Sequence, residues 1–328
     1  MQRLPKNKKK IELETTNIDK LRQLFASLKE ILQEVNIRIT NKISDNEEII
    51  KKNGIYIVTM DTKTVALFHV SIMASSFSKF ITDEEEIIFG VNVGQFYDVL
   101  QNMNSDSDSP LVIIMTDKNT DELTFIRKHG KNNRITGCLK LLTLKMEKPK
   151  FSPQKYVAAI SIKSSEFQTL CKKTNNISET LCIDCTESNV VFSICDGENS
   201  VKYEYKYEND DDIMTIQFST EGLNNVKYIR GTYQIKYLVA FQKCATLCNH
   251  IQLNITNVES LLVVLYEAID FCRIYLILPN NDLEEKNYES TRIPYSESSD
   301  EDQEDDEKVK NDSIDQSEYS DDDVTPDE

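Results

Sequence analysis

The chain has 328 residues, of which 39% are hydrophobic, and a formal net charge of −17. This length is sufficient for two domains of ordinary size. No stretch reaches the roughly 18 apolar residues of a membrane span, and the N-terminus lacks the apolar core of a secretory signal peptide. We therefore expect a soluble intracellular protein with no membrane partner.

The negative charge is concentrated at one end of the chain. Residues 282–328 hold 20 Asp and Glu against four Lys and Arg, a net of −16, so the remainder holds 35 acidic and 34 basic residues, a net of −1. We interpret residues 282–328 as a disordered acidic tail, because such a composition cannot bury a core. Residues 1–10, which include PKNKKK, form a basic N-terminal arm. A nearly neutral body can still present one basic face.

The predicted elements follow a repeating order of one strand, one helix and three strands. In the first half, strands are expected at 11–14, 35–40, 54–60, 65–72, 86–89, 111–115, 122–127 and 135–145, and helices at 18–32 and 92–102. In the second half, strands are expected at 157–162, 180–185, 190–194, 201–207, 213–218, 229–232, 250–255, 261–266 and 273–278, and helices at 165–173 and 234–244. Residues 41–53 form a polar insertion without an apolar period, and residues 146–155, with two prolines and three lysines, form a linker between domains. This order indicates an α+β fold with mostly antiparallel sheet.

Three of the predicted helices carry basic residues beside their apolar stripe. The stripe of the first is Leu21, Phe25, Leu28 and Leu32, and that of the last is Ile235, Leu238, Val239 and Phe241. The flanks, at helical spacing, are Arg22, Ala26 and Lys29 in the first helix, Ser165, Thr169 and Lys172 in the third, and Lys236, Ala240 and Lys243 in the last. Any one flank is typical of a solvated helix surface, whereas three in register favour a shared basic surface.

The starts of the second and third helices carry capping signals. Ser165 with Gln168 three residues later is the pattern of a capping box, and Asn92 is a preferred N-cap residue. The helix after Asn92 departs from the basic pattern, because its flank is Gly94, Asp98 and Gln101.

The sequence offers no catalytic or metal-binding constellation. His69, His129 and His250 have no neighbouring carboxylate or cysteine at the spacing of a triad or metal site. Cys182 and Cys185 form a C-x-x-C within an alternating strand, without a second pair at ligand spacing. Phosphate-binding glycine motifs are absent from the sequence. We therefore expect a protein that is not an enzyme and has no cofactor or metal.

The chain resembles a known family over residues 11–279. The stretches that carry the resemblance are LFASLKEIL, VTMDTKTVALFHVSI, FGVNVGQFYDVL, residues 139–156, YLVAFQKCATL and SLLVVLYEAIDFCRIYLILP. They are similar, in order, to the eukaryotic-type DNA sliding clamp family, proliferating cell nuclear antigen. The insertion, the tail and the Ile-, Lys- and Asn-rich composition indicate a divergent member, viral or from a protist.

The resemblance implies a fold and a function. The fold would be the DNA-clamp fold, with an N-terminal domain at 11–145, a connecting linker at 146–155 and a C-terminal domain at 156–281, and three copies closing head to tail into a homotrimeric ring. The ring would encircle double-stranded DNA without regard to sequence and act as a processivity factor. Its partners would be DNA polymerase and other replication and repair proteins with clamp-binding peptide motifs, and a clamp loader. Its location would be the nucleus, or a cytoplasmic replication site for a viral member.

The resemblance also implies three sets of site residues. The DNA-facing residues would be Arg22, Lys29, Lys172, Lys173, Lys236 and Lys243. The partner-binding pocket would comprise Met60, Leu67, Phe151, Tyr156, Leu261, Leu276, Leu278 and Pro279. The subunit interface would include Ile135, Cys138, Tyr203 and Tyr205. Two alternatives remain open at this point: a subunit of a heterotrimeric checkpoint-type clamp, and a replication scaffold that does not encircle DNA.

Overall fold

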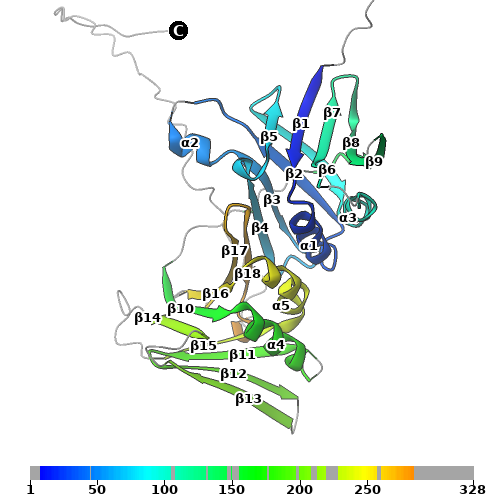
Figure 1. The fold of residues 1–328 in the computed structure, drawn as a ribbon. Helices are drawn as coiled ribbons and strands as arrows, with labels where there is room; N and C mark the ends of the chain where they lie inside the picture. Colours follow the sequence, from blue (N-terminus) through cyan, green and yellow to red (C-terminus); the bar gives the residue numbers. More distant parts are fainter. Residues whose placement is uncertain are drawn as a thin grey trace, which may run out of the picture. The chain divides into compact units, whose positions relative to one another are not determined.

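The computed structural model describes the part of the chain that forms the two domains. The described residues are 8–44, 46–104, 108–130, 132–145, 149, 155–175, 177–196, 199–207, 213–218, 228–256 and 260–283. The predicted acidic tail, apart from its first two residues, lies outside the described residues, as do most of the linker and of the basic arm. Figure 1 shows the arrangement of the elements.

The elements of the first half contain both predicted helices and one short helix that was not predicted. They are β1 (Lys9–Thr15), α1 (Ile18–Leu28), β2 (Glu34–Thr40), α2 (Glu47–Lys51), β3 (Gly54–Met60), β4 (Leu67–Met73), η1 (Ala74–Ser76), β5 (Lys79–Thr82), β6 (Glu86–Asn92), α3 (Val93–Asn102), β7 (Leu111–Thr116), β8 (Asn119–His129) and β9 (Asn133–Lys140).

The second half follows the same order. Its elements are β10 (Tyr156–Lys163), α4 (Ser164–Thr174), β11 (Thr180–Thr186), β12 (Asn189–Asp196), β13 (Asn199–Lys206), β14 (Met214–Phe218), β15 (Tyr228–Gln234), α5 (Ile235–Phe241), η2 (Gln242–Leu247), β16 (His250–Thr256), β17 (Leu262–Ala268), β18 (Cys272–Leu278) and η3 (Asn281–Leu283). The unit of one strand, one helix and three strands therefore occurs four times, as the sequence predicted. The additional strands β5 and β14 stand at the same place in each half.

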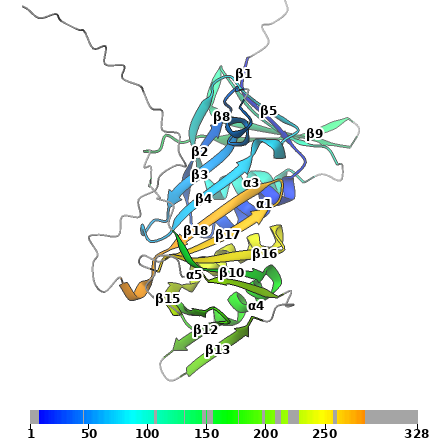
Figure 2. The ribbon, with the colours of Figure 1, turned by 90° about the vertical axis from the view of Figure 1, so that its left-hand side faces the viewer.

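The strands form three antiparallel sheets, and one of them runs through both domains. Its order is β14-β10-β16-β17-β18-β4-β3-β2-β6, so that β18 of the second half pairs with β4 of the first. The other two sheets have the orders β5-β1-β7-β8-β9 and β13-β12-β11-β15. Figures 1 and 2 show β9 and β13 as the last strands of these two sheets.

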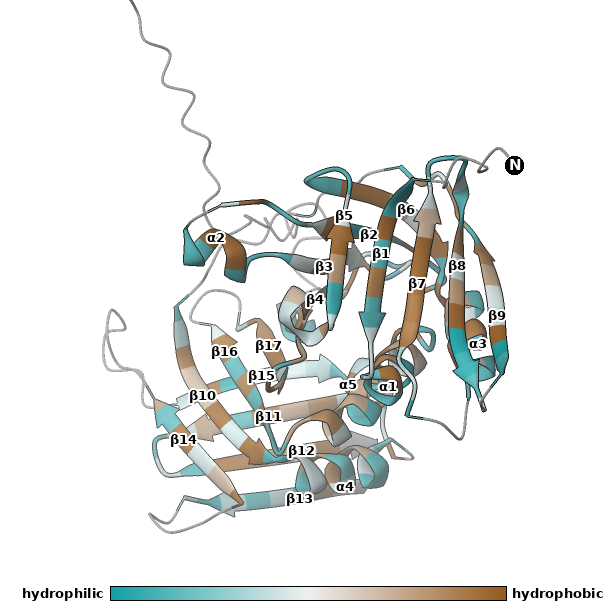
Figure 3. Ribbon diagram, turned by 45° about the horizontal axis from the view of Figure 1, so that its top comes forward, coloured by the Kyte–Doolittle hydropathy of each residue, from teal (hydrophilic) through white to brown (hydrophobic). Residues whose placement is uncertain are grey.

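The four longer helices cover one face of the sheets and contribute to the main hydrophobic core. The predicted stripe of α1 and the loop after it, Leu21, Phe25, Leu28 and Leu32, is at most 3% exposed. Phe25 stacks on Phe96 of α3, with ring centroids 4.1 Å apart. Along the strands, buried apolar residues alternate with more exposed ones, as Figure 3 shows by the change between brown and teal. This alternation is what a sheet with one buried face requires.

Two elements differ from the predicted ones, and a local signal accounts for the first. Within the polar insertion, the Asn46 side chain accepts a hydrogen bond from the Glu48 amide, and this N-cap begins the short helix α2. Asn53 closes the base of the insertion, because its side chain accepts from the Lys42 amide and donates to the Lys42 carbonyl. The predicted helix at 234–244 instead consists of α5 followed by the 3-10 helix η2.

The two predicted helix caps have different outcomes. The Asn92 side chain accepts a hydrogen bond of 3.0 Å from the Gln95 amide, which confirms it as the N-cap of α3. The capping box at Ser165 is wrong, because α4 begins one residue earlier, after Lys163, without a side-chain cap. Gln168 instead contacts η2. In the part of the chain that the structure describes, no helix has the length and apolar character needed to cross a membrane.

Candidate functional site

The helix layer presents the predicted lysines at its surface. Lys29 follows α1 as its C-cap residue, Lys172 and Lys173 are in the last turn of α4, and Lys236 and Lys243 are in α5 and η2. All five are exposed. The surface is therefore lined by ammonium groups from both domains, which attract phosphates without reading base edges.

Neighbouring side chains hold several of these lysines in place. The Lys29 ammonium lies 3.8 Å from the ring centroid of Tyr97 on α3, and Lys236 lies 4.5 Å from that of Tyr237. Lys243 forms an ion pair of 2.9 Å with Glu30, which joins η2 to the end of α1. Half-exposed ion pairs of this kind contribute little to stability. The ion pair with Glu30 nevertheless positions the Lys243 ammonium group between η2 of one domain and the end of α1 of the other.

Arg22 does not belong to this exposed set. Its Nε donates a hydrogen bond of 3.0 Å to the Leu100 carbonyl, its Nη1 contacts Asp19 at 2.6 Å, and its side chain is only 14% exposed. In the other domain, Gln168 of α4 donates a hydrogen bond of 2.9 Å to the Gln242 carbonyl. Both side chains therefore connect the first helix of their domain to the second. Arg22 thus has a helix-packing role in the structure, and its role as a DNA-facing residue stays a prediction.

The surface of α3 differs from that of the other helices, as the sequence predicted. Asp98 and Gln101 are both exposed, and the Gln101 amide contacts the hydroxyl of Tyr97. Gly94 completes this flank near the start of the helix. α3 itself therefore contributes no basic side chain to this surface. The ammonium group of Lys29, at the end of α1, lies over the ring of Tyr97 instead.

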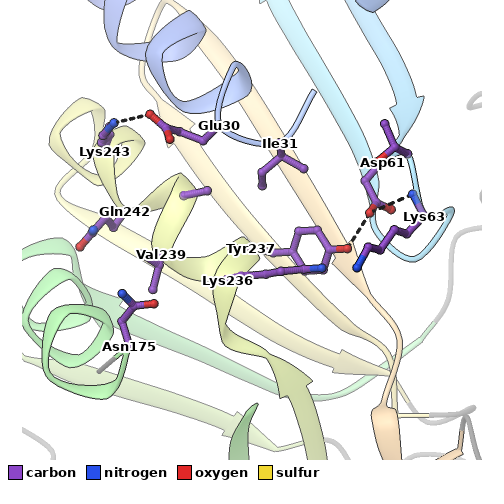
Figure 4. A pocket seen from close by; sticks show the side chains of 12 residues that line it. Glu30, Ile31, Asp61, Lys63, Asn175, Lys236, Tyr237, Val239, Gln242 and Lys243 are labelled. Carbon is purple, nitrogen blue, oxygen red and sulfur yellow. Dashed lines mark hydrogen bonds and ion pairs between the residues drawn. The ribbon is translucent and has the colours of Figure 1, made fainter. Parts of the chain in front are cut away.

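A groove of about 420 Å³ lies where the two domains meet on the helix side (Figure 4). The end of α1, the β3–β4 turn, the end of α4, and α5 with η2 contribute its walls. Three of the lining residues, Lys63, Lys236 and Lys243, are basic. Lys63 was not among the predicted site residues. It is found only from the three-dimensional arrangement, because the turn that carries it has no helical period.

A buried carboxylate organises this groove. Asp61 is 5% exposed, and its Oδ1 accepts hydrogen bonds from the amides of Val65 at 2.7 Å and Ala66 at 2.8 Å. These contacts fix a turn in which Thr64 has a φ of 56°. The Tyr237 hydroxyl of α5 donates a further hydrogen bond of 2.7 Å to Oδ2 (Figure 4). Asp61 therefore shapes the turn of one domain and fastens it to a helix of the other.

The face of the large sheet away from the helices carries a second, smaller apolar cluster. Leu67, Val263 and Ile277 are its buried centre, and Val58, Met60 and Tyr275 are packed around it. The cross-strand pairs Met60–Leu67, Leu67–Ile277 and Ile277–Val263 place four of these residues in one row across β3, β4, β18 and β17. The half-buried side chains at the edge of this cluster are an accessible apolar surface.

The structure separates the predicted pocket residues into different places. Met60 and Leu67 belong to the outer cluster, whereas Leu276 and Leu278 are in the main core on the other face of β18. Tyr275 and Ile277 occupy the outer positions instead, because successive strand residues point to opposite faces. Leu261 is buried, Pro279 is half-buried after β18, and Tyr156 is 37% exposed at the start of β10. Phe151 lies outside the described residues, so its role stays a prediction.

The predicted interface residues lie on two strands that each pair with one other strand among the described residues. Ile135 and Cys138 are on β9, which pairs with β8, and Tyr203 and Tyr205 are on β13, which pairs with β12. Ile135, Tyr203 and Tyr205 are half-buried against the core, and Cys138 is exposed. The ammonium of Lys173 lies 5.7 Å from the centroid of the Tyr203 ring, so one predicted DNA-facing lysine is next to β13.

Buried cysteine thiols of the core are held in their neutral form. Burial raises the pKa of the Cys171, Cys185 and Cys244 thiols to about 12. Thiols of this kind are inert packing residues. Among the described residues, no group of three or more His, Cys, Asp or Glu side chains is arranged to hold a metal ion.

Comparison with known proteins identifies the family. Residues 10–149 match the family described as proliferating cell nuclear antigen, N-terminal domain, and residues 150–281 match its C-terminal domain. The chain belongs to the proliferating cell nuclear antigen family.

Curated members of the proliferating cell nuclear antigen family are distant relatives of this chain. The antigen of Chaetomium thermophilum is 25% identical over 238 residues, which cover 71% of this chain and 88% of the relative. Proliferating cell nuclear antigen 1 of Plasmodium falciparum is 22% identical over 254 residues, 75% of this chain and 85% of the relative. The crystal structure of the Entamoeba histolytica antigen has the same fold, with a TM-score of 0.69 at 17% identity, and covers 83% of this chain and 99% of that structure.

Membership of the proliferating cell nuclear antigen family gives the two surfaces a context. The family supports a clamp function for this divergent member, as a scaffold for replication and not as an enzyme. The fold places the lysines of both domains on the helix side and the small apolar cluster on the opposite face of the sheet. A single chain thus separates a polyanion-attracting surface from an apolar one.

Proposed function

We propose that this chain is a DNA polymerase processivity factor, a sliding clamp that forms a head-to-tail homotrimer around duplex DNA. The observation that carries the proposal is the sheet topology. The chain joins its own domains through β18 and β4, and it leaves β9 and β13 at the ends of the two remaining sheets. Pairing β9 of one copy with β13 of the next removes these two of the sheets' edge strands, and unpaired edges are otherwise exposed to aggregation.

The helix surface is suited to DNA that moves. The exposed ammonium groups of Lys29, Lys172, Lys173, Lys236 and Lys243 attract phosphates wherever the duplex stands, so the free energy changes little as the DNA advances. Each contact is screened by salt over about 8 Å at physiological ionic strength. Persistence on DNA therefore comes from encirclement and not from affinity.

The outer apolar cluster is the proposed docking place for partner peptides. Met60, Leu67, Tyr275 and Ile277, with Val58 and Val263 beside them, offer an apolar surface to a segment with aliphatic or aromatic anchors. Burying a few such anchors can supply several kcal/mol before the cost of ordering the peptide. The partners proposed are DNA polymerase, other replication and repair proteins with clamp-binding peptide motifs, and a clamp loader. The proposed location is the nucleus, or a cytoplasmic replication site if the protein is viral.

A light-scattering dilution series tests the ring. A mass of three chains that persists on dilution is expected, and a monomer at every concentration would overturn the homotrimer. The DNA-facing surface is tested separately with the double variant Lys172→Glu and Lys236→Glu. We expect this variant to remain trimeric and to lose most of its processivity in primer extension by a cognate polymerase. The matched control is Lys51→Glu with Lys118→Glu, which makes the same change of charge outside the helix layer and should leave processivity unaltered.

A heterotrimeric checkpoint-type clamp remains the second candidate, together with a scaffold that does not encircle DNA. The observation that favours them is the flank of α3, where Asp98 and Gln101 stand in place of basic residues. A chain that shares its ring with other subunits does not need to line the whole hole with lysines. A monomeric mass in the dilution series would support these candidates, and recovery of a trimer on adding other subunits would distinguish the first from the second.

A further inference from the structure

The junction inside the chain provides a template for the junction between chains. In the large sheet, five strands of the second half, β14-β10-β16-β17-β18, meet four strands of the first half, β4-β3-β2-β6. The remaining sheets have five strands, β5-β1-β7-β8-β9, and four strands, β13-β12-β11-β15. Because the two halves repeat the same order of elements, β9 takes the place of β18 and β13 takes the place of β4.

The hairpin that precedes each joining strand aligns β9 with β18. The β8–β9 hairpin closes with the pair His129–Asn133, and the β17–β18 hairpin closes with Ala268–Cys272. Asn133 therefore corresponds to Cys272, and Ile135 corresponds to Ile274. The burial agrees, because Ile135 and Ile274 both pack against the main core.

The helix starts align β13 with β4. Glu34 pairs with Asn92 at the start of α3, and Thr180 pairs with Gln234 at the start of α5. β2 therefore aligns with β11, so that Arg38 matches Asp184. Their partners on the next strands, Tyr56 of β3 and Val191 of β12, then match each other. One strand further, Ser71 of β4 matches Glu204 of β13.

Two observations check this alignment. It makes Arg22 equivalent to Gln168 and Leu100 equivalent to Gln242. The two hydrogen bonds agree with this, because Arg22 donates to the Leu100 carbonyl in one domain and Gln168 donates to the Gln242 carbonyl in the other. It also matches the inward residue Val70 with Tyr203, and both pack against the main core.

From these two alignments, and resting on the ring proposed above, we infer the residue register of the subunit junction. The pairs inside the chain are Arg273–Ser71, Ile274–Val70 and Ile277–Leu67. They translate into Arg134 opposite Glu204, Ile135 opposite Tyr203 and Cys138 opposite Ser200 of the next subunit. The partner of this surface is a second copy of the same chain, in antiparallel pairing.

The side chains on each face suit this register. On the inward face, Ile135 meets Tyr203, and Gly137 meets Val201. On the outward face, exposed Arg134 meets exposed Glu204, and opposite charges directly across two strands stabilise the pair.

Shifted registers are unfavourable for two reasons. Glu204 lies between Lys202 and Lys206 on the outward face of β13, so a shift of two residues in either direction sets Arg134 against a lysine. A shift of one residue turns Ile135 toward the wrong face.

Native Cys138 makes the register measurable with one substitution. Residues directly opposite in an antiparallel pair have Cα atoms about 4.5–5.5 Å apart, within the range of about 4.4–6.8 Å that a disulfide spans. We expect Ser200→Cys to form subunit-linked dimers and trimers on mild oxidation of the full chain. These species should disappear when Cys138 is also changed to Ser. Lys202→Cys and Lys206→Cys are matched controls on the same face, and they should cross-link at least tenfold more slowly.

The outcomes separate the register from the ring. The register is wrong if Lys202→Cys or Lys206→Cys cross-links faster than Ser200→Cys. It is also wrong if Ser200→Cys forms no cross-link in a chain that light scattering shows to be trimeric. Neither result contradicts the ring. A chain that is monomeric overturns the proposed function itself. As a second test, Arg134→Glu and Glu204→Arg should each raise the trimer dissociation constant at least tenfold, and the double variant should restore it by at least half on a logarithmic scale. Failure of the double variant to restore association would overturn the Arg134–Glu204 pair.

Discussion

The hydroxyl of Tyr237 donates a hydrogen bond of 2.7 Å to Oδ2 of Asp61, across 176 positions of the chain. Both side chains are buried, and the bond connects α5 of the second domain to the β3–β4 turn of the first. The same carboxylate accepts hydrogen bonds from the backbone amides of Val65 and Ala66. The shape of the turn and the packing of the helix therefore depend on one side chain.

Tyr237→Phe tests this connection. The change keeps the ring in the core and removes only the hydroxyl. A hydrogen bond to a charged group contributes about 1.5–3 kcal/mol, and its loss leaves the buried carboxylate less well satisfied. We expect the free energy of unfolding to fall by that amount in urea titrations at fixed protein concentration. Tyr97→Phe, which removes an exposed hydroxyl, is the control and should change stability by less than about 0.5 kcal/mol. Equal effects of the two substitutions would contradict the role of the bond.

Arg22→Ala separates packing from DNA contact. Its guanidinium contacts Leu100 and Asp19 rather than solvent, so its removal should lower the free energy of unfolding by about 1–3 kcal/mol. The slope of log K for DNA association against log salt should stay the same. Lys236→Ala should do the opposite: it should preserve stability and reduce the slope by about 0.9 if it removes one phosphate contact. A reduced slope for Arg22→Ala would show instead that Arg22 faces DNA.

Alkylation of the cysteines reports on the packing of the core. Burial raises the pKa of the Cys171, Cys185 and Cys244 thiols to about 12, so the reactive thiolate is almost absent at pH 8 and the reagent has no access. We expect iodoacetamide to leave these three unmodified in the folded protein at pH 8, as measured by peptide mass spectrometry. In urea all three should react. Modification of any of them at the rate of a small-molecule thiol would show that the core opens in the native state.

The ion pairs of Glu12 between β1 and β5 should make the stability of the fold depend on pH. Hydrogen bonds from the ammonium groups of Lys79, at 2.8 Å, and Lys9, at 2.7 Å, lower the pKa of its carboxyl group. A carboxyl group whose pKa is lower in the folded state contributes stability above its unfolded pKa of about 4.3, and that contribution is lost as the pH falls through the folded pKa. Glu12→Gln should therefore be less stable than the native chain at pH 7, by less than about 1 kcal/mol. The difference should vanish near pH 2, and a difference that grows on acidification would contradict this account.

The sequence predicted the elements best where a local pattern decides them. The stripe of α1 is buried as expected, and so are Ile235, Leu238 and Phe241 of α5, because a 3.6-residue period commits a helix to one face wherever it packs. Val239, the fourth residue of the α5 stripe, is only half-buried and lines the groove. The cap at Asn92 is confirmed for the same local reason. β5 was not predicted as a strand, because its four residues have no period of their own and its pairing with β1 stabilises it.

The surroundings of the predicted site residues could not be derived from the sequence, because they depend on neighbours distant in the chain. An arginine at the correct helical spacing was expected to be exposed, but the Leu100 carbonyl of another helix binds it. Leu276 and Leu278 were expected to lie with Met60 and Leu67, but they belong to the main core, and Tyr275 and Ile277 lie on the face of β18 that carries the outer cluster. In a strand buried on both faces, hydrophobicity alone does not indicate which face a residue takes.

The sequence by itself determined the four repeated units, the helix faces and the concentration of acidic charge in residues 282–328, because each depends on residues within one turn, one strand or one run. Only the tertiary structure decided which side chains of the two domains meet. The joining of β18 with β4, the bond between Tyr237 and Asp61 and the groove that includes Lys63 all depend on residues far apart in the chain. Such contacts follow from the packing of whole sheets and helices, and no local pattern encodes them.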